Sequence, residues 1–98
     1  MPEDAIKIAS HIYKVVFENE RVRVLEARMT PCAKSELHSH PAVVAIGLSA
    51  GKYKFTSPDG QSMEAELPAG QVMYMDAVDH ATENVGNTEG LVILVELK

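Results

Sequence analysis

The feature that most restricts the fold of this 98-residue chain is a series of short apolar runs, each closed by turn-forming residues. Runs rich in Val, Ile, Leu, Tyr and Met cover residues 12–17, 22–29, 37–48, 52–56, 63–67, 72–75 and 91–95. Between them lie turn signals such as Ser57-Pro58-Asp59-Gly60, in which Pro suits the second position of a β-turn and Gly the fourth. We find no convincing helix of more than ten residues in the pattern. About eight or nine short strands at this spacing predict an all-β sandwich or barrel.

Two runs depart from simple alternation. In residues 22–29 the apolar positions change faces near Leu25, which predicts a β-bulge or a strand buried on both faces. Residues 91–95 read Leu-Val-Ile-Leu-Val, the continuous pattern of a strand buried on both faces. Residues 1–10 leave three interpretations open: a frayed tail, an added edge strand and one helical turn. We expect residues 1–98 to form a single domain, since single-core domains commonly run to about 100–150 residues.

The charge distribution excludes several classes of partner. Nine basic and fourteen acidic residues give a formal net charge of −5, without a cluster of Lys or Arg. Nucleic acids and anionic membrane surfaces are therefore not expected partners. The longest apolar run, residues 42–48, is far shorter than the roughly 20 residues of a membrane span. Cys32 is the only cysteine and the N-terminus lacks a secretory pattern, which predicts a cytoplasmic protein.

Three histidines form the candidate functional group. His38 and His40 are two residues apart in an expected strand, so both side chains point to the same face. His80 follows forty residues later, where a folded barrel can bring a third imidazole to the first two. The sequence therefore predicts a divalent metal ion held by these three side chains. Its identity stays open among Fe, Zn, Ni, Cu and Mn.

Two motifs surround these histidines. His38-Ser39-His40 is followed by Val44 and Gly51, and Gly70 is followed by Asp76, Val78, His80 and Asn84. This arrangement resembles the motifs of small single-domain cupins of the cupin 2 conserved-barrel type. In those motifs Glu follows His-x-His after three or four residues, and the second motif runs Gly, Pro-x-Gly, His, Asn. The resemblance implies an RmlC-like double-stranded β-helix, or jelly-roll barrel, with a metal ion in its interior.

Departures from the family pattern change what the resemblance implies. Val44 stands in place of the family's glutamate ligand, so three neutral imidazoles would leave the metal charge uncompensated. We expect such a site to favour an anionic or chelating small molecule. If the strand continues through Pro41, Val44 faces the same interior as the histidines and forms an apolar wall. Cys32 and Asp76 stand where the family usually has Gly and Pro, which leaves the turn geometry there open.

Four further residues are candidates for the pocket or for contacts behind the metal ligands: Glu36, Val44, Asp76 and Asn84. Glu36 shares the parity of His38 and is either a substitute carboxylate, a group that orients an imidazole, or a solvated side chain. Asp76 either helps to orient His80 or serves as a local acceptor in a turn.

The sequence leaves the activity open. As an enzyme the protein would be a metal-dependent dioxygenase or other oxygenase, or an isomerase acting on a small molecule, and no catalytic residue is identified. The alternatives are a non-catalytic module that binds or senses a small ligand, and a dimer in which the metal only stabilises the fold. We also expect a homodimer, because a small domain with the apolar run 91–95 needs cover.

Overall fold

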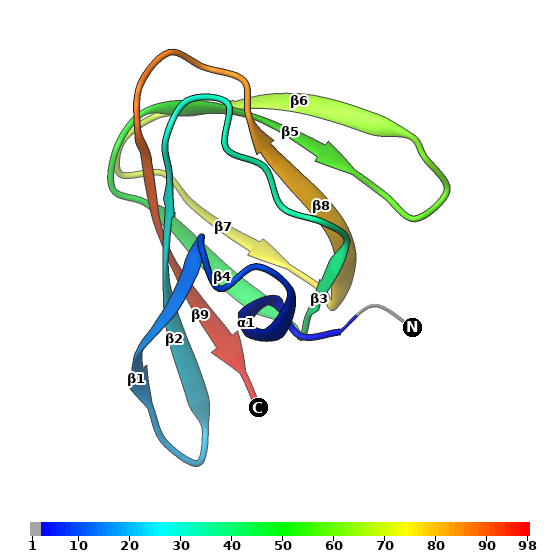
Figure 1. Ribbon diagram of the computed structural model, residues 1–98. Helices are drawn as coiled ribbons and strands as arrows, with labels where there is room; N and C mark the ends of the chain where they lie inside the picture. The colour runs from blue at the N-terminus through cyan, green and yellow to red at the C-terminus, as the bar shows by residue number, and fades with distance from the viewer. Residues whose placement is uncertain (1–2) are drawn as a thin grey trace.

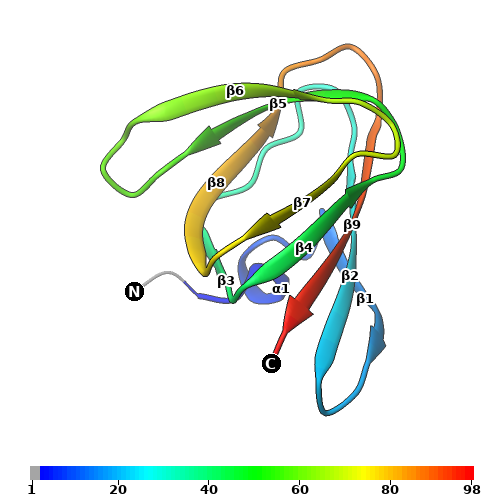
Figure 2. The ribbon, with the colours of Figure 1, turned by 180° about the vertical axis from the view of Figure 1, so that it is seen from behind.

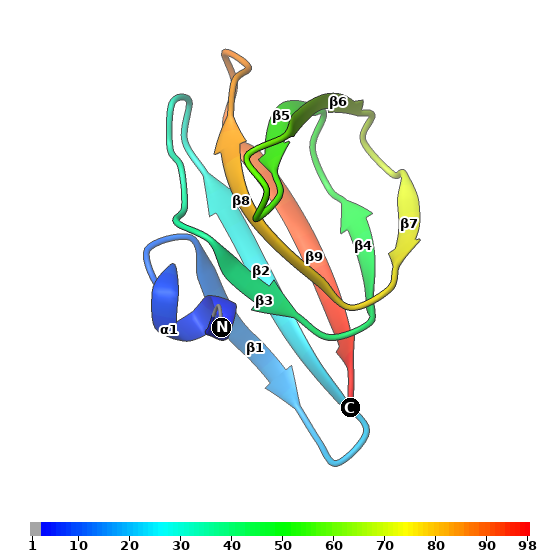
Figure 3. The same ribbon diagram turned by 90° about the vertical axis from the view of Figure 1, so that its right-hand side faces the viewer.

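The computed structural model describes residues 3–98, which form two antiparallel sheets that face each other, preceded by one helical turn (Figures 1 and 3). In order across the five-stranded sheet the strands are β1 (Tyr13–Glu18), β2 (Val22–Met29), β9 (Gly90–Leu97), β4 (Val43–Gly47) and β7 (Val72–Met75). Across the four-stranded sheet they are β3 (His38–His40), β8 (Val78–Asn84), β5 (Gly51–Thr56) and β6 (Ser62–Leu67). The all-β prediction is confirmed. Within residues 3–98, no helix has the length and apolar character needed to cross a membrane.

The single helical turn, α1 (Ala5–Ile8), lies beside β1 and β3 (Figure 3). Asp4 caps it, because its carboxylate accepts a hydrogen bond from the Ile6 backbone N–H at 3.1 Å. The Ser39 N–H donates to the carbonyl of Glu3 at 2.8 Å, which joins this segment to the strand that carries two of the histidines. Of the three interpretations of residues 1–10, the helical turn is therefore the one observed, and residues 1 and 2 lie outside the described residues.

Alternation along the strands directs one face of each sheet into a shared core. On β2 the buried positions are Leu25, Ala27 and Met29, and on β4 they are Val43 and Ala45. Leu94 of β9 adds to this core from the same sheet, and Tyr53 of β5 and Leu67 of β6 add to it from the facing sheet. Figure 2 shows β9, β4 and β7 side by side in the five-stranded sheet.

The two predicted irregularities come out differently in the structure. β2 pairs with β9 without interruption, from Val22 opposite Leu97 to Met29 opposite Gly90. The register shift lies instead in β1, between Val15 and Phe17, and alternate side chains of β2 stay partly exposed, so neither alternative for residues 22–29, a bulge or burial on both faces, is observed. The prediction that residues 91–95 are buried on both faces is also wrong, because alternate side chains there stay partly exposed on the outer face.

The expected strand 37–48 is in fact two strands in different sheets. β3 ends at His40 and β4 begins at Val43, so the chain changes sheet around Pro41. Proline lacks an N–H for a continuing ladder, which is consistent with a break at this position. The change of sheet also changes which residues face inward, from even positions in β3 to odd positions in β4.

The turn after β2 explains one departure from the family motif. The Ala33 N–H donates to the carbonyl of Thr30 at 3.0 Å, and Cys32 between them has φ of 70°. Pro31 followed by a residue with positive φ is the pattern of a type II turn, whose third position favours glycine. Cys32 thus occupies a left-handed conformation at the place where the family usually has Gly.

Candidate metal centre

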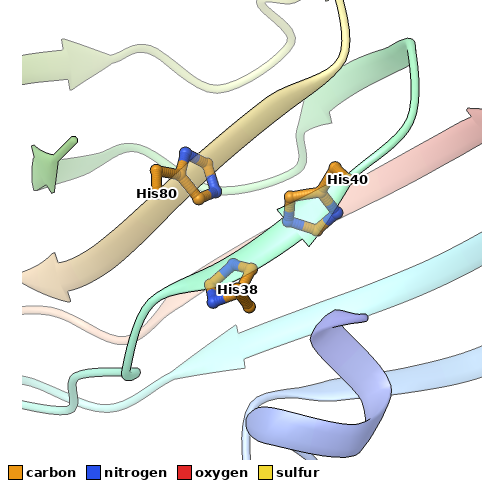
Figure 4. A group of neighbouring side chains, drawn as sticks. All are labelled: His38, His40 and His80. Carbon is orange, nitrogen blue, oxygen red and sulfur yellow. The ribbon is translucent and has the colours of Figure 1, made fainter. Parts of the chain in front are cut away.

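The three histidines meet inside the barrel (Figure 4). His38 and His40 lie on β3, and β8 pairs with this strand in a register that sets His80 directly opposite His38. All three side chains are buried, and one nitrogen of each lies within 4.8 Å of the others. The structure therefore brings together the residues that the motif predicts, while metal binding itself stays a prediction.

Backbone geometry sets the orientation of His38. Its Nδ1 lies 2.8 Å from the carbonyl oxygen of Glu36, which only accepts, so Nδ1 carries the proton. The lone pair is then on Nε2, and the hydroxyl of Tyr13, at 3.2 Å, donates to it. Burial lowers the pKa of His38, which favours the neutral form that coordinates a metal.

A buried carboxylate orients His40. Its Nδ1 lies 2.7 Å from Oε2 of Glu96, and the Glu96 residue is only 1% exposed. The other oxygen of Glu96 accepts from Nε of Arg23 at 2.8 Å. A carboxylate behind an imidazole fixes the orientation of the ring, an arrangement common behind metal-ligating histidines. It leaves Nε2 of His40 turned toward the other two rings.

Arg23 links this pair to the N-terminal turn. Its guanidinium contacts both Glu96 and Asp4, the residue that caps α1. The hydrogen bond with Asp4 and the contacts with Glu96 hold the pKa of Arg23 above its usual range, so the cation persists. Burial alone would raise the pKa of Asp4, but its hydrogen bond and charge interaction with Arg23 lower it. The charges behind His40 therefore form one network that reaches the surface at α1.

His80 has the least polar environment of the three histidines. Burial lowers its pKa to about 3, and the neighbouring rings of His40 and His38 act in the same direction. The ring stacks on Phe55 with centroids 5.5 Å apart and planes inclined by 21°. Among the described residues nothing hydrogen-bonds to its buried Nε2. An imidazole held neutral, with an unsatisfied buried nitrogen aimed at two others, fits a metal ligand.

The donor set fits a transition metal ion. Three neutral imidazole nitrogens suit Fe, Zn, Ni or Cu, and three protein ligands leave coordination positions for a further molecule. The hydrogen bonds behind His38 and His40 hold the rings in orientations that would present Nε2 to such an ion. Groups that would not themselves touch a metal therefore fix the orientation of two of the three rings.

A small cavity beside His40 and His80 extends into the core. It is lined almost entirely by apolar and aromatic side chains of both sheets, and its volume is about 50 Å³. At about 10–15 Å³ per water, that is space for a few water molecules or one small organic group. Two buried hydroxyls in its lining, those of Thr82 and Tyr53, have no hydrogen-bond partner among the described residues.

The other predicted site residues do not reach the histidines through their side chains. Glu36 is exposed, and only its backbone carbonyl contributes. Asp76 is exposed and accepts a hydrogen bond from the Tyr74 hydroxyl at 3.0 Å. Asn84 is buried, but its amide bonds the carbonyls of Met29 and Thr88 and so holds the loop before β9. Of the alternatives for Glu36 and Asp76, the structure therefore shows the solvated side chain and the local acceptor, and Asn84 has a structural role away from the histidines.

The prediction that Val44 faces the histidines is wrong. Because the chain changes sheet around Pro41, Val44 points to the outer face of the five-stranded sheet, and the cavity is lined by Ala45 instead. Ala45 follows His40 after four residues, the longer of the two spacings in the motif. Alanine therefore occupies the family's glutamate position, so the three histidines have no carboxylate beside them at that position as a fourth ligand.

Sequence reasoning missed Tyr13, Arg23 and Glu96. For Glu96 a signal was present, because it continues the inner-face series of Val92 and Leu94 in an otherwise apolar strand. A charged residue at an inward position needs a partner, and this one has two. Tyr13 carried no signal, because tyrosine is ordinary in a strand and its contact with His38 depends on the folded topology.

Comparison with solved structures supports the fold. A cupin domain from Bordetella pertussis Tohama I is 29% identical, with a TM-score of 0.81, and the match covers 89% of this chain and 92% of that one. A protein with a double-stranded β-helix domain from Klebsiella pneumoniae is 21% identical, with a TM-score of 0.70 and coverage of 88% and 75%. An RmlC-like cupin from Methanocaldococcus jannaschii is 14% identical, with a TM-score of 0.69 and coverage of 88% and 78%. No family model and no curated protein matches the chain.

These matches confirm the resemblance that the two histidine motifs predict. The chain folds as a cupin, a double-stranded β-helix, with three buried histidines close enough together to hold a metal ion. Cupin barrels carry many chemistries, so the fold does not identify the reaction.

Proposed function

We propose that this protein binds one divalent transition metal ion through Nε2 of His38, His40 and His80, and presents it to a small anionic molecule. The observation that carries this proposal is the convergence of three buried imidazoles within 4.8 Å of one another. Two of them are oriented from behind by a carbonyl and a carboxylate, and the third has a buried nitrogen without a partner. Neutral imidazoles leave the charge of the ion available to an anion.

As an enzyme, the protein would be a metal-dependent oxygenase, such as a small-molecule dioxygenase, or an isomerase. The metal would supply Lewis acidity or, if it is iron, oxygen binding. The residues of the chain would hold and orient the ion, and the walls of the cavity beside it are almost entirely apolar. The narrow cavity limits the substrate to a small molecule.

A non-catalytic module that binds or senses a small ligand is the second candidate. It is favoured by the composition of the cavity, because its lining residues within the described part of the chain include no carboxylate, amine or thiol. Histidine and tyrosine are then the only titratable groups available for proton transfer, and the histidines are engaged as ligands. Oxygen uptake by the iron-loaded protein in the presence of small chelating acids distinguishes an oxygenase from this module.

Metal titration tests the proposal. Protein purified without an affinity tag is offered Zn²⁺, Fe²⁺, Co²⁺, Ni²⁺, Cu²⁺ and Mn²⁺, and bound metal is measured after dialysis. We expect about one ion per chain, since three ligands converge on one point, and a sharp loss when any of the three histidines is replaced by Ala. Glu36→Ala is the control, because its side chain is exposed. Full occupancy in His80→Ala, or an equal loss in Glu36→Ala, contradicts the site.

We also propose that the protein is a homodimer in the cytoplasm, where the exposed Cys32 thiol stays reduced. Cross-strand pairing lines up apolar side chains on the outer face of the five-stranded sheet. The two rows are Phe17, Val24, Val95, Val44 and Tyr74, and then Ile93, Ile46 and Val72. Exposed apolar rows of this kind favour a second copy of the same face as partner.

Sedimentation of a pair of variants tests the dimer. Val72, on the outer face, is 61% exposed, and Met63, on the four-stranded sheet, is 67% exposed. Val72→Lys is expected to shift the protein toward the monomer, whereas Met63→Lys leaves the dimer intact, because only the first places a charge in the apolar face. A wild-type protein that is monomeric at micromolar concentration contradicts the proposal.

A further inference from the structure

One hydroxyl beside the metal site must change partner when a metal binds. The Tyr13 hydroxyl lies 3.2 Å from Nε2 of His38 and is its hydrogen donor, since Nδ1 of that ring already donates to the Glu36 carbonyl. A metal at this site would take the same Nε2 lone pair. The buried phenol then loses its acceptor, and a buried donor without an acceptor is costly. An oxygen atom of a ligand bound to such a metal would be a suitable replacement acceptor.

A second hydroxyl faces the same space. Thr82 lies two residues beyond His80 on β8, so its side chain points to the same interior face. Its backbone is paired with Ser35, but Oγ1 is buried and has no hydrogen-bond partner among the described residues. Burial raises the pKa of the Tyr13 hydroxyl to about 12, and the nearby Thr82 side chain acts to lower it. The two hydroxyls nevertheless do not meet hydrogen-bond geometry. Two hydroxyls therefore lie next to the histidines: that of Tyr13, whose acceptor a metal would take, and that of Thr82, which has no partner among the described residues.

We propose that the hydroxyls of Tyr13 and Thr82 form a subsite that holds an oxygen atom of a small carboxylate bound to the metal. The inference rests on the proposed function, because the metal supplies the positive charge that attracts the anion. Lysine and arginine are absent from the cavity lining within residues 3–98, so recognition of the anion falls to neutral donors. The carboxylate is a short one, since the volume of the cavity is only about 50 Å³.

The subsite has a role distinct from metal binding. The hydroxyls do not hold the ion but fix the orientation of the second carboxylate oxygen or of a chelating group beside it. They select oxygen anions that accept two hydrogen bonds over neutral ligands of the same size. Tyr13 and Thr82 are thus specificity-determining residues of the ligand site.

The test is a titration of Co²⁺-loaded protein with acetate, followed by the visible absorption of the cobalt ion. Tyr13→Phe and Thr82→Val each remove one hydroxyl with little change in shape. Tyr74→Phe is the matched control, because it deletes an exposed tyrosine hydroxyl that bonds Asp76 outside the cavity. Cobalt content is measured first for every variant. A failure to bind cobalt in wild type therefore contradicts the proposed function separately from the subsite.

We expect Thr82→Val to bind cobalt like the wild type and Tyr13→Phe to bind it at least as tightly, because the phenol no longer occupies Nε2 of His38. Each variant should weaken acetate binding about tenfold, as expected for one hydrogen bond to a charged group. Tyr74→Phe retains wild-type acetate affinity. Unchanged acetate affinity in both cavity variants overturns the subsite. A tyrosinate-to-metal charge-transfer band in Cu²⁺-loaded wild type, absent from Tyr13→Phe, also overturns it, because Tyr13 would then be a ligand to the metal.

Discussion

Replacing Glu96 by Gln tests how much the charge behind His40 contributes to the metal centre. Glu96 is 1% exposed, with one oxygen 2.7 Å from Nδ1 of His40 and the other 2.8 Å from Nε of Arg23. Glutamine keeps the shape and can keep an oxygen acceptor toward His40. The substitution therefore removes the negative charge while leaving the ring orientation available.

The expected loss of metal affinity is about 10- to 100-fold, the usual effect of removing a carboxylate behind a metal-ligating histidine. This corresponds to about 1.4–2.7 kcal/mol. The metal-free protein is also destabilised, because Arg23 loses one of its two carboxylate partners. Breaking a buried ion pair costs about 3–5 kcal/mol. The loss here is expected below that range, since Arg23 is 19% exposed and still pairs with Asp4.

Calorimetric metal titration measures the first effect, and urea unfolding of the metal-free protein measures the second. Glu89→Gln is the control, because Glu89 forms a surface pair with Arg28 at 2.8 Å and its side chain is 47% exposed. We expect the control to change stability by less than about 0.5 kcal/mol and to leave metal affinity unchanged. Equal metal affinity in Glu96→Gln and wild type refutes the reasoning and assigns Glu96 a purely structural role with Arg23.

Three further predictions follow from the geometry. Ala45→Glu, which turns a carboxylate into the cavity, tightens metal binding in a titration, whereas Val44→Glu on the outer face does not; the reverse order contradicts the assigned change of sheet. In the metal-free protein, burial lowers the pKa of His80 to about 3 from 6.5, so the unfolded chain binds the extra proton between these values. The contribution to stability is complete above pH 6.5 and is lost as the pH falls toward 3, by about 2 kcal/mol at pH 5. Urea unfolding should therefore show a smaller loss from pH 7 to pH 5 in His80→Gln, and an identical loss contradicts the shift. Cys32→Gly relieves a left-handed backbone conformation that costs about 1–2 kcal/mol, and the greater entropy of glycine in the unfolded chain offsets about 0.5–1 kcal/mol of this gain. Thermal unfolding is therefore expected at a higher temperature than in wild type. A lower unfolding temperature would show that the conformation of Cys32 is not strained.

The sequence predicts those parts of the fold that depend on neighbouring residues. Strands and turns follow from alternation and from signals such as Ser57-Pro58-Asp59-Gly60, because these act over a few residues. The meeting of His38 and His40 with His80 was predictable only through the resemblance to cupin motifs, since their separation along the chain says nothing by itself about their distance in space.

The errors arise where the outcome depends on pairing between distant strands. Val44 was expected to face the histidines because the alternation was carried through Pro41, whereas the chain changes sheet there and the inward parity changes with it. For β2 a bulge or burial on both faces was expected, but the extra residue lies in its partner β1. Glu96 contacts His40 from the opposite sheet, a contact that no local pattern specifies.

The most direct test of the metal centre is anomalous diffraction from crystals of the Co²⁺-loaded protein. The account predicts one strong anomalous peak per chain inside the barrel, about 2.0–2.2 Å from Nε2 of His38, His40 and His80, as metal–imidazole bonds require. The Nδ1 atoms of His38 and His40 should keep their bonds to the Glu36 carbonyl and to Glu96. A peak bound through Nδ1, or one located away from these three rings, would contradict the account.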